Sequence, residues 1–145
     1  GGEESGGISI RGHIPEGDGI LMGLLLLEVM AEMKAPLHEI VADLQAQYGP
    51  ACYDRIDARL AHQIPKKDMV QRLANAAPTH AGGESIIRVD TLDGVKFYLA
   101  DGSWLLIRPS GTEPVLRIYA EARTPVFRDA LLKMGEELGQ RVTNI

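Results

Sequence analysis

Two Asp-Gly pairs, Asp93-Gly94 and Asp101-Gly102, constrain the fold of this chain more than any other feature of its sequence. Each pair separates two runs in which apolar residues recur at alternate positions, which is the strongest short-range signal for a β-hairpin. The three runs cover residues 84–92, 94–100 and 103–109. We therefore predict consecutive antiparallel strands, and the alternating stretch at residues 115–122 predicts a further strand.

Helical patterns lie on both sides of these strands in the sequence. Residues 65–78 begin and end with proline and carry apolar residues at helical spacing, and residues 125–142 show a longer apolar face of the same period. Residues 52–60 alternate enough to form another strand. These patterns predict an α+β domain at residues 49–145, in which an antiparallel sheet buries one face against helices.

Residues 1–48 are organised differently. A glycine-rich loop is followed by an apolar helix at residues 19–33, with Asp18 placed to cap it, and by an amphipathic helix at residues 37–48. Glu28 and Glu32 interrupt the apolar stretch well short of the ~20 residues that a membrane span needs, so we expect a helix buried on most sides. Because this segment lacks a sheet of its own, we interpret it as the helical end of a larger α/β domain.

The composition limits the kinds of binding partner and the cellular compartment that we expect for this chain. The chain has 145 residues and a formal net charge of −5, which argues against binding nucleic acid or an anionic membrane through a basic face. The single cysteine, Cys52, excludes an internal disulfide and a metal site made of several cysteines. Together with the absence of a recognisable targeting segment, this favours a cytoplasmic protein.

The stretch "RPSGTEP", residues 108–114, offers the chemistry of an anion site. Arg108 supplies a planar fork of donors that suits two phosphate oxygens. Ser110 and Thr112 add hydroxyl donors, and Gly111 lets backbone amides approach an oxyanion. The same residue types are common in plain turns, which on residue types alone are favoured by about two to one. Glu113 would repel phosphate unless it pairs with an arginine or points away.

The stretch "GGEESGG", residues 1–7, offers the chemistry of a polyol site. Carboxylates beside a serine can accept hydrogen bonds from sugar hydroxyls, although a flexible terminus is the plain alternative. His13, shortly afterwards, could donate to a sugar hydroxyl or a phosphate. We predict no metal site here, because one histidine with scattered carboxylates lacks a defined ligand spacing.

Taken together and in this order, the two motifs resemble those of the phosphohexomutase superfamily, enzymes that move a phosphoryl group between the 1 and 6 positions of an aldohexose. "GEESGG" resembles the sugar-specificity loop at the end of the family's third domain, and "RPSGTEP" resembles the phosphate-binding loop of its fourth domain. "GHIPEGDGI", residues 12–20, is similar to the segment that follows the sugar loop in α-phosphoglucomutases. Gly17 departs from the family pattern, which often has a lysine there.

The resemblance implies a role for each matched residue. Glu3 and Ser5 would hydrogen-bond the 3- and 4-hydroxyls of the sugar, and His13 would lie near the bound phosphosugar. Arg117, on the strand after the loop, would add a phosphate contact, with a solvated strand face as the alternative. The phosphate that is not transferred would be held by Arg108, Ser110, Gly111 and Thr112.

The resemblance also implies a longer parent enzyme. The family's phosphoserine loop and magnesium loop lie in its first two domains, and no stretch of this sequence matches either. We therefore expect the C-terminal portion of a phosphoglucomutase-like enzyme, with a hexose phosphate as substrate, magnesium as cofactor of the parent, and the absent N-terminal domains as partners. The parent would interconvert glucose 1-phosphate and glucose 6-phosphate through a phosphoserine and a bisphosphate, and the chain alone would be inactive. The alternatives are specificity for mannose or glucosamine, and a non-catalytic phosphosugar-binding module.

Overall fold

The computed structural model describes residues 1–2 and 7–143 of the chain. These residues divide into two compact units, of which the first ends at Gly49 and the second begins at Pro50. Each unit has its own internal packing and is described by itself.

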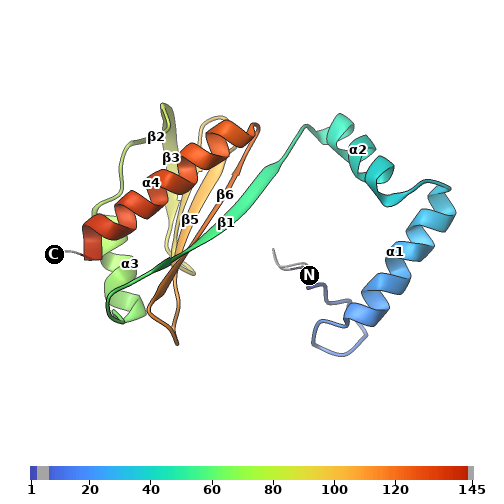
Figure 1. Cartoon of the computed structure of the whole chain (residues 1–145), viewed down its shortest axis with the longest axis horizontal. Coiled ribbons are helices and arrows are strands. Elements are labelled where there is room, and N and C mark those ends of the chain that lie inside the picture. Colours follow the sequence, from blue (N-terminus) through green and yellow to red (C-terminus); the bar gives the residue numbers. More distant parts are fainter. Residues whose placement is uncertain (3–6, 144–145) are drawn as a thin grey trace. The chain divides into compact units, whose positions relative to one another are not determined.

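The second unit consists of a six-stranded sheet and two helices (Figure 1). All neighbouring strands are antiparallel, and their order across the sheet is β1-β6-β5-β4-β3-β2. The elements in chain order are β1 (Cys52–Arg59), α3 (Lys66–Asn75), β2 (His80–Ala81), β3 (Glu84–Asp90), β4 (Val95–Leu99), β5 (Trp104–Pro109), β6 (Val115–Ala122) and α4 (Pro125–Thr143).

Both predicted hairpins are present. The Asp93-Gly94 pair lies between β3 and β4, and the Asp101-Gly102 pair lies between β4 and β5. Gly94 has a φ of +101° and Gly102 a φ of +89°, which is the backbone region that glycine tolerates and other residues avoid. The predicted α+β fold with an antiparallel sheet is therefore confirmed, and the two turns lie at opposite ends of β4.

The core of this unit lies between the sheet and the two helices, which contact each other as well as the strands. Alternate residues of β4, β5 and β6 point into it, which leaves the intervening residues on the face opposite the helices. Fully buried side chains include Met69, Leu73, Val95, Phe97, Leu99, Leu105, Ile107, Leu116, Ile118, Leu131, Leu138 and Val142.

Helix α4 lies unusually close to the sheet because two of its buried residues are glycines. A Cβ atom on Gly135 would lie 2.6 Å from Cγ2 of Ile118, and one on Gly139 would lie 2.7 Å from Cδ1 of Leu116. Both contacted residues belong to β6. The close approach fixes β6, the strand that follows the "RPSGTEP" loop, against the helix.

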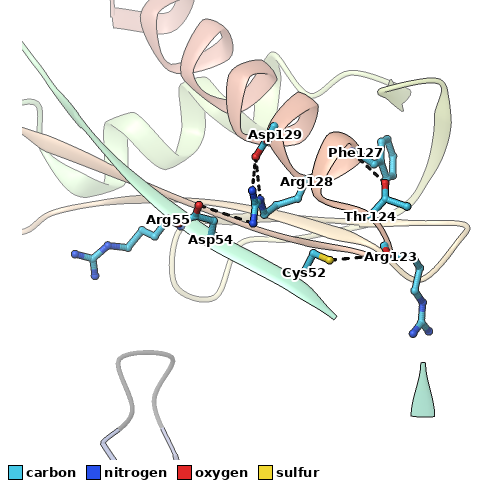
Figure 2. A network of polar contacts seen from close by, with 8 residues as sticks. All are labelled: Cys52, Asp54, Arg55, Arg123, Thr124, Phe127, Arg128 and Asp129. Atoms are coloured by element: carbon cyan, nitrogen blue, oxygen red, sulfur yellow. Dashed lines mark hydrogen bonds and ion pairs between the residues drawn. The ribbon is translucent and has the colours of Figure 1, made fainter. Parts of the chain in front are cut away.

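Polar contacts surround the first turn of α4, beside the end of β1 (Figure 2). The hydroxyl of Thr124 accepts a hydrogen bond from the backbone N–H of Phe127 at 3.2 Å, which is an N-terminal cap. The guanidinium of Arg128 pairs with Asp129 at 2.7 Å and lies 3.9 Å from a carboxylate oxygen of Asp54 on β1. The contact between Arg128 and Asp54 joins the start of α4 to β1 at the end of the sheet that lies away from the β5–β6 loop.

The first unit contains α1 (Gly19–Met33) and α2 (Leu37–Tyr48), at the predicted positions. The carboxylate of Asp18 caps α1, since it accepts hydrogen bonds from the backbone N–H groups of Ile20 at 3.1 Å and Leu21 at 3.0 Å. In the part of the chain that the structure describes, no helix has both the length and the apolar character needed to cross a bilayer.

The predicted burial of α1 is wrong for this chain. No residue of α1 is buried, and Ile20, Leu24 and Leu27 expose 82%, 59% and 61% of their surface. The physical reason is the small amount of structure available to cover it, since α1 packs against α2 within a unit of 49 residues. An apolar helix of this kind needs contacts on several sides, and one neighbouring helix covers one side.

Candidate functional site

The loop between β5 and β6 is shaped by the side chain of Ser110, which is 8% exposed. Its Oγ atom accepts hydrogen bonds from the backbone N–H groups of Thr112 at 3.4 Å and Glu113 at 3.2 Å. The backbone N–H of Ser110 donates to the carbonyl of Val115 at 2.9 Å, which closes the base of the loop. These hydrogen bonds within the chain give the loop a defined shape.

The outer side of this loop is open. Gly111, Thr112 and Glu113 are exposed, and a Cβ atom on Gly111 would meet no other atom within 4 Å. The side-chain amide of Gln63 donates to the carbonyl of Gly111 at 3.0 Å and so ties the loop to the segment before α3. A small anion could reach the loop from solvent without displacing any part of the fold.

Arg108 lies at the end of β5, where it leads into the loop, and its side chain is 37% exposed. Its Nε atom is 2.8 Å from a carboxylate oxygen of Asp93 in the β3–β4 turn. The other carboxylate oxygen of Asp93 is 2.6 Å from Nζ of Lys66, the first residue of α3. The hydrogen bond from Lys66, followed by the charge of Arg108, holds the pKa of Asp93 below its ordinary value. Asp93 is thus an ionised bridge between two cations.

Arg117 lies directly opposite Arg108 in the pairing of β5 with β6. Its Nε atom is buried, and within residues 1–2 and 7–143 it has no hydrogen-bond partner. Asp57 lies opposite Arg117 on the other neighbouring strand, but its carboxylate pairs with Nε of Arg55 at 3.0 Å. Like charges directly opposite each other destabilise a sheet, and a buried donor without a partner adds to that cost. An anion bound beside the two arginines would offset both effects.

Glu113 is exposed at the tip of the loop, and its backbone N–H, rather than its carboxylate, makes the contact with Ser110. The exposure of Glu113 is compatible with a carboxylate that lies in solvent rather than against a phosphate.

In the first unit, His13 is held by the same carboxylate that caps α1. Nε2 of His13 lies 3.0 Å from Oδ2 of Asp18. The pKa of Asp18 is lowered, chiefly by the hydrogen bond from the backbone N–H of Leu21 and next by the hydrogen bond with His13. Gly17, just before this cap, is exposed and has no atom within 4 Å of the place where its Cβ would be.

The predicted sugar-binding residues Glu3 and Ser5 lie outside the described residues. The backbone beside them is defined: Gly2 pairs with Ile8 as an antiparallel bridge, and the backbone N–H of Ser9 donates to the carbonyl of Gly1 at 2.8 Å. His13 follows in the same unit, whereas Arg108, Ser110, Gly111, Thr112 and Arg117 gather at one end of the sheet in the other unit.

The sequence interpretation missed Asp93, Lys66 and Gln63. The predicted β-hairpins contained the signal for Asp93, because pairing β4 with β5 puts Val95 opposite Ile107 and so brings the preceding turn to the start of the loop. No comparable signal exists for Lys66, whose position depends on how α3 packs. No group of three or more His, Cys, Asp or Glu side chains in the described part of the chain is arranged to hold a metal ion.

The sheet, its two helices and the open β5–β6 loop beside Arg108 and Arg117 define an α+β domain suited to binding an anion. The model of the C-terminal domain of phosphoglucomutase/phosphomannomutase matches residues 54–132, and the model of the alpha/beta/alpha domain III of the same proteins matches residues 1–48. The chain belongs to the phosphoglucomutase/phosphomannomutase family, of which it comprises the C-terminal portion.

Individual relatives agree with this assignment. The chain is 38% identical over 123 residues to a phosphoglucosamine mutase of Methanococcus aeolicus, which covers 83% of this chain and 25% of the relative. It is 36% identical over 123 residues to a phosphopentomutase of Thermococcus kodakarensis, covering 85% of this chain and 26% of the relative. The chain thus spans about a quarter of the length of these curated relatives.

A solved structure of a phosphoglucomutase/phosphomannomutase family protein from Burkholderia thailandensis has the same fold. It superposes with a TM-score of 0.68 at 21% sequence identity, over 97% of this chain and 28% of the other. At this identity the likeness concerns the fold alone.

Proposed function

We propose that this chain is the substrate-anchoring part of a phosphosugar mutase, which binds the sugar hydroxyls and the phosphate that is not transferred. The observation that carries the proposal is the open β5–β6 loop, which has a defined shape and lies beside Arg108 and Arg117. An anion site needs fixed donors and access from solvent, and this end of the sheet offers both.

Each residue of the loop has a distinct task in this proposal. The guanidinium of Arg108 binds two phosphate oxygens, and Arg117 contributes a second positive charge from the neighbouring strand. The hydroxyl of Ser110 already accepts two backbone N–H groups, so its own hydrogen remains to be donated to the ligand. Thr112 adds a hydroxyl, and the missing side chain of Gly111 leaves room for the phosphate.

The sugar end of the substrate is assigned to the first unit. We propose that Glu3 and Ser5 bind the 3- and 4-hydroxyls, as the likeness of "GEESGG" to the family's sugar loop implies. His13 would donate to the phosphosugar, and its contact with Asp18 supports this role by orienting the imidazole ring. Asp18 is itself fixed by its two bonds to the start of α1.

In the longer enzyme, we propose that a phosphoserine gives its phosphoryl group to a sugar hydroxyl, and that the resulting bisphosphate returns its other phosphoryl group to the serine. This chain contributes positioning, because holding the distal phosphate brings the reacting oxygen to the serine. Magnesium would neutralise charge on the transferred group. The described residues offer it no ligand set, so we assign its ligands to the rest of the enzyme.

Glucose and glucosamine phosphates are the two substrates that we propose. The form of the "GEESGG" loop favours glucose, whereas the names of relatives such as the Methanococcus aeolicus protein favour glucosamine. Glucose, glucosamine and mannose differ from one another at C2 and have the same configuration at C3 and C4. Residues that contact the 3- and 4-hydroxyls therefore do not separate them, and kcat/KM for the three 1-phosphates, measured on the longer enzyme, decides between them.

The anchoring role is tested by titrating the 15N-labelled chain with glucose 1-phosphate. We expect saturable shifts of the Gly111 and Thr112 amide signals, loss of these shifts in Arg108→Ala, and their retention in Arg88→Ala. Arg88 is a matched control, since it is an arginine on β3 that lies 3.7 Å from the ring centre of Tyr98. Absence of shifts in the unsubstituted chain would indicate an α+β domain whose loop is a plain turn.

A further inference from the structure

Both turns contain an Asp-Gly pair, but the two aspartates make different contacts. The carboxylate of Asp101 accepts hydrogen bonds from the backbone N–H of Ser103 at 2.9 Å and from its hydroxyl at 2.8 Å, so it serves its own turn. The carboxylate of Asp93 instead contacts Lys66 and Arg108, two residues distant in sequence. The contacts of Asp101 stabilise its own turn. The contacts of Asp93 do not stabilise its hairpin turn and need another explanation.

The turn that carries Asp93 is fixed against the backbone of Arg108. A Cβ atom on Gly94 would lie 2.5 Å from the carbonyl oxygen of Ile107 and 2.9 Å from Cα of Arg108. Only a residue without a side chain permits this approach. The backbone of the turn is thereby held against the start of the arginine side chain.

We propose that Asp93 is a positioning residue for the phosphate site, holding the guanidinium of Arg108 in the orientation that receives phosphate, with Lys66 offsetting its negative charge. This inference rests on the proposed function of the β5–β6 loop. Asp93 contacts the guanidinium at Nε, and in this arrangement the phosphate oxygens are received by the terminal nitrogens.

The physical gain is a smaller loss of conformational freedom on binding. A long arginine side chain loses rotamer entropy when it is ordered on binding, and a side chain ordered beforehand avoids part of that loss. The arrangement also has an electrostatic cost, because Asp93 puts a negative charge near the incoming anion. Lys66 reduces this cost, since the three side chains together keep a net positive charge.

A single substitution of Asp93 distinguishes its positioning effect from its electrostatic effect, because the two change phosphate affinity in opposite directions. Asp93→Asn removes the negative charge and keeps a residue that forms Asx-Gly turns well. If the carboxylate acted on the anion only through its charge, the variant would bind phosphate more tightly. If Asp93 positions Arg108, the variant binds phosphate more weakly in spite of its additional positive charge.

The experiment is a titration of the 15N-labelled chain, its Asp93→Asn variant and its Asp101→Asn variant with inorganic phosphate. We expect Asp93→Asn to raise the Kd by about 3- to 10-fold, the range for weakening one charge-assisted contact. It should also shift the Nε–H signal of Arg108 before phosphate is added. Asp101→Asn makes the same chemical change at the other end of β4, and we expect it to alter neither quantity.

Each outcome has a separate meaning. An unchanged or lower Kd for Asp93→Asn, with phosphate bound normally by the unsubstituted chain, overturns the positioning role and leaves the proposed function standing. Failure of the unsubstituted chain to bind phosphate overturns the proposed function and this inference with it. Amide spectra report whether each variant is folded. Asp93→Ser, another neutral turn residue, provides the same comparison if Asp93→Asn is poorly folded.

Discussion

At the scale of single residues, Gly111 and Gly94 differ in what a methyl group would meet. Gly111 has open space around it, whereas Gly94 combines a positive φ of +101° with backbone atoms at 2.5 and 2.9 Å. Substitution by alanine is therefore expected to affect ligand binding at Gly111 and the stability of the fold at Gly94.

We predict that Gly111→Ala keeps the free energy of unfolding within about 0.5 kcal/mol and weakens phosphate binding by about 10-fold. Gly94→Ala should lower the free energy of unfolding by about 1–3 kcal/mol through backbone strain and steric overlap. Urea unfolding and phosphate titration measure the two effects. Unweakened phosphate binding by Gly111→Ala would count against the role of Gly111 in the site.

Asp93 predicts a pH dependence with a definite sign. Its pKa in the folded protein is below the ordinary value of 3.8, chiefly through the hydrogen bond from Lys66 and next through the charge of Arg108. The folded state thus binds this proton more weakly than the unfolded chain does. The stabilisation is complete above pH 3.8 and is lost as the pH falls through the lowered pKa.

The measurement is the difference in unfolding free energy between the unsubstituted chain and Asp93→Asn across pH. We expect this difference to stay constant from about pH 8 to pH 5 and to shrink only in more acidic solution. Urea titrations at fixed ionic strength provide the values. A difference that changes near neutral pH would mean that another group titrates against Asp93.

At the scale of elements, the packing of α4 on β6 depends on Gly135. Alanine there would gain about 1 kcal/mol of helix propensity, but its Cβ would lie 2.6 Å from Cγ2 of Ile118 and 3.1 Å from Cδ1 of Leu105. A β-branched side chain such as Ile118 has little freedom to move away. Overpacking of this kind costs about 1–3 kcal/mol, which meets or exceeds the gain.

We therefore predict that Gly135→Ala lowers the Tm of the chain, as measured by thermal unfolding followed by circular dichroism. Lys133→Ala is the control, because the side chain of Lys133 is 77% exposed on the same helix and its replacement should leave the Tm nearly unchanged. A higher Tm for Gly135→Ala would show that the sheet moves to accept the methyl group.

The elements could be predicted because their signals are local. Alternation and turn residues predicted the hairpins of β3, β4 and β5, and helical spacing predicted α2 at the bounds that the structure has. Strand β2 was missed, since two residues are too few to show a period. The face that an element buries depends on its neighbours, and for that reason the burial of α1 was predicted wrongly.

The candidate site was predicted as far as its residues are adjacent in sequence. Arg108, Ser110 and Gly111 lie within four consecutive positions, and Arg117 follows at the distance that a hairpin sets. Lys66 and Asp93 come from a helix and from another turn, and they meet Arg108 only through tertiary packing. The contacts that orient an arginine cannot be seen from its motif alone.

At the scale of the whole molecule, the chain contains a sheet domain with its own core and a pair of helices whose apolar residues are mostly exposed. The second unit has a continuous core, whereas Ile40 is the buried apolar residue in the described part of the first unit. Because the chain spans about a quarter of the length of its relatives, we propose that the remaining domains cover α1.

We predict that the chain by itself binds phosphosugar without converting it. Incubation with glucose 1-phosphate, magnesium and a trace of the hexose bisphosphate should give no glucose 6-phosphate above a protein-free control. The physical reason is that this chain is proposed only to position the substrate, and the phosphoserine that would carry the phosphoryl group is assigned to the rest of the longer enzyme. Sustained formation of glucose 6-phosphate would show that the chain contains a catalytic centre of its own.

The outermost strands of the sheet determine how the second unit behaves toward other copies of itself. On one side β2 has only two residues, and on the other β1 carries exposed Asp54, Arg55, Asp57 and Arg59. A short edge and a charged edge both resist the addition of a strand from another molecule. Growth of the sheet into a fibril is therefore opposed on both sides, and concentrated solutions of this chain should associate first through the apolar surface of α1.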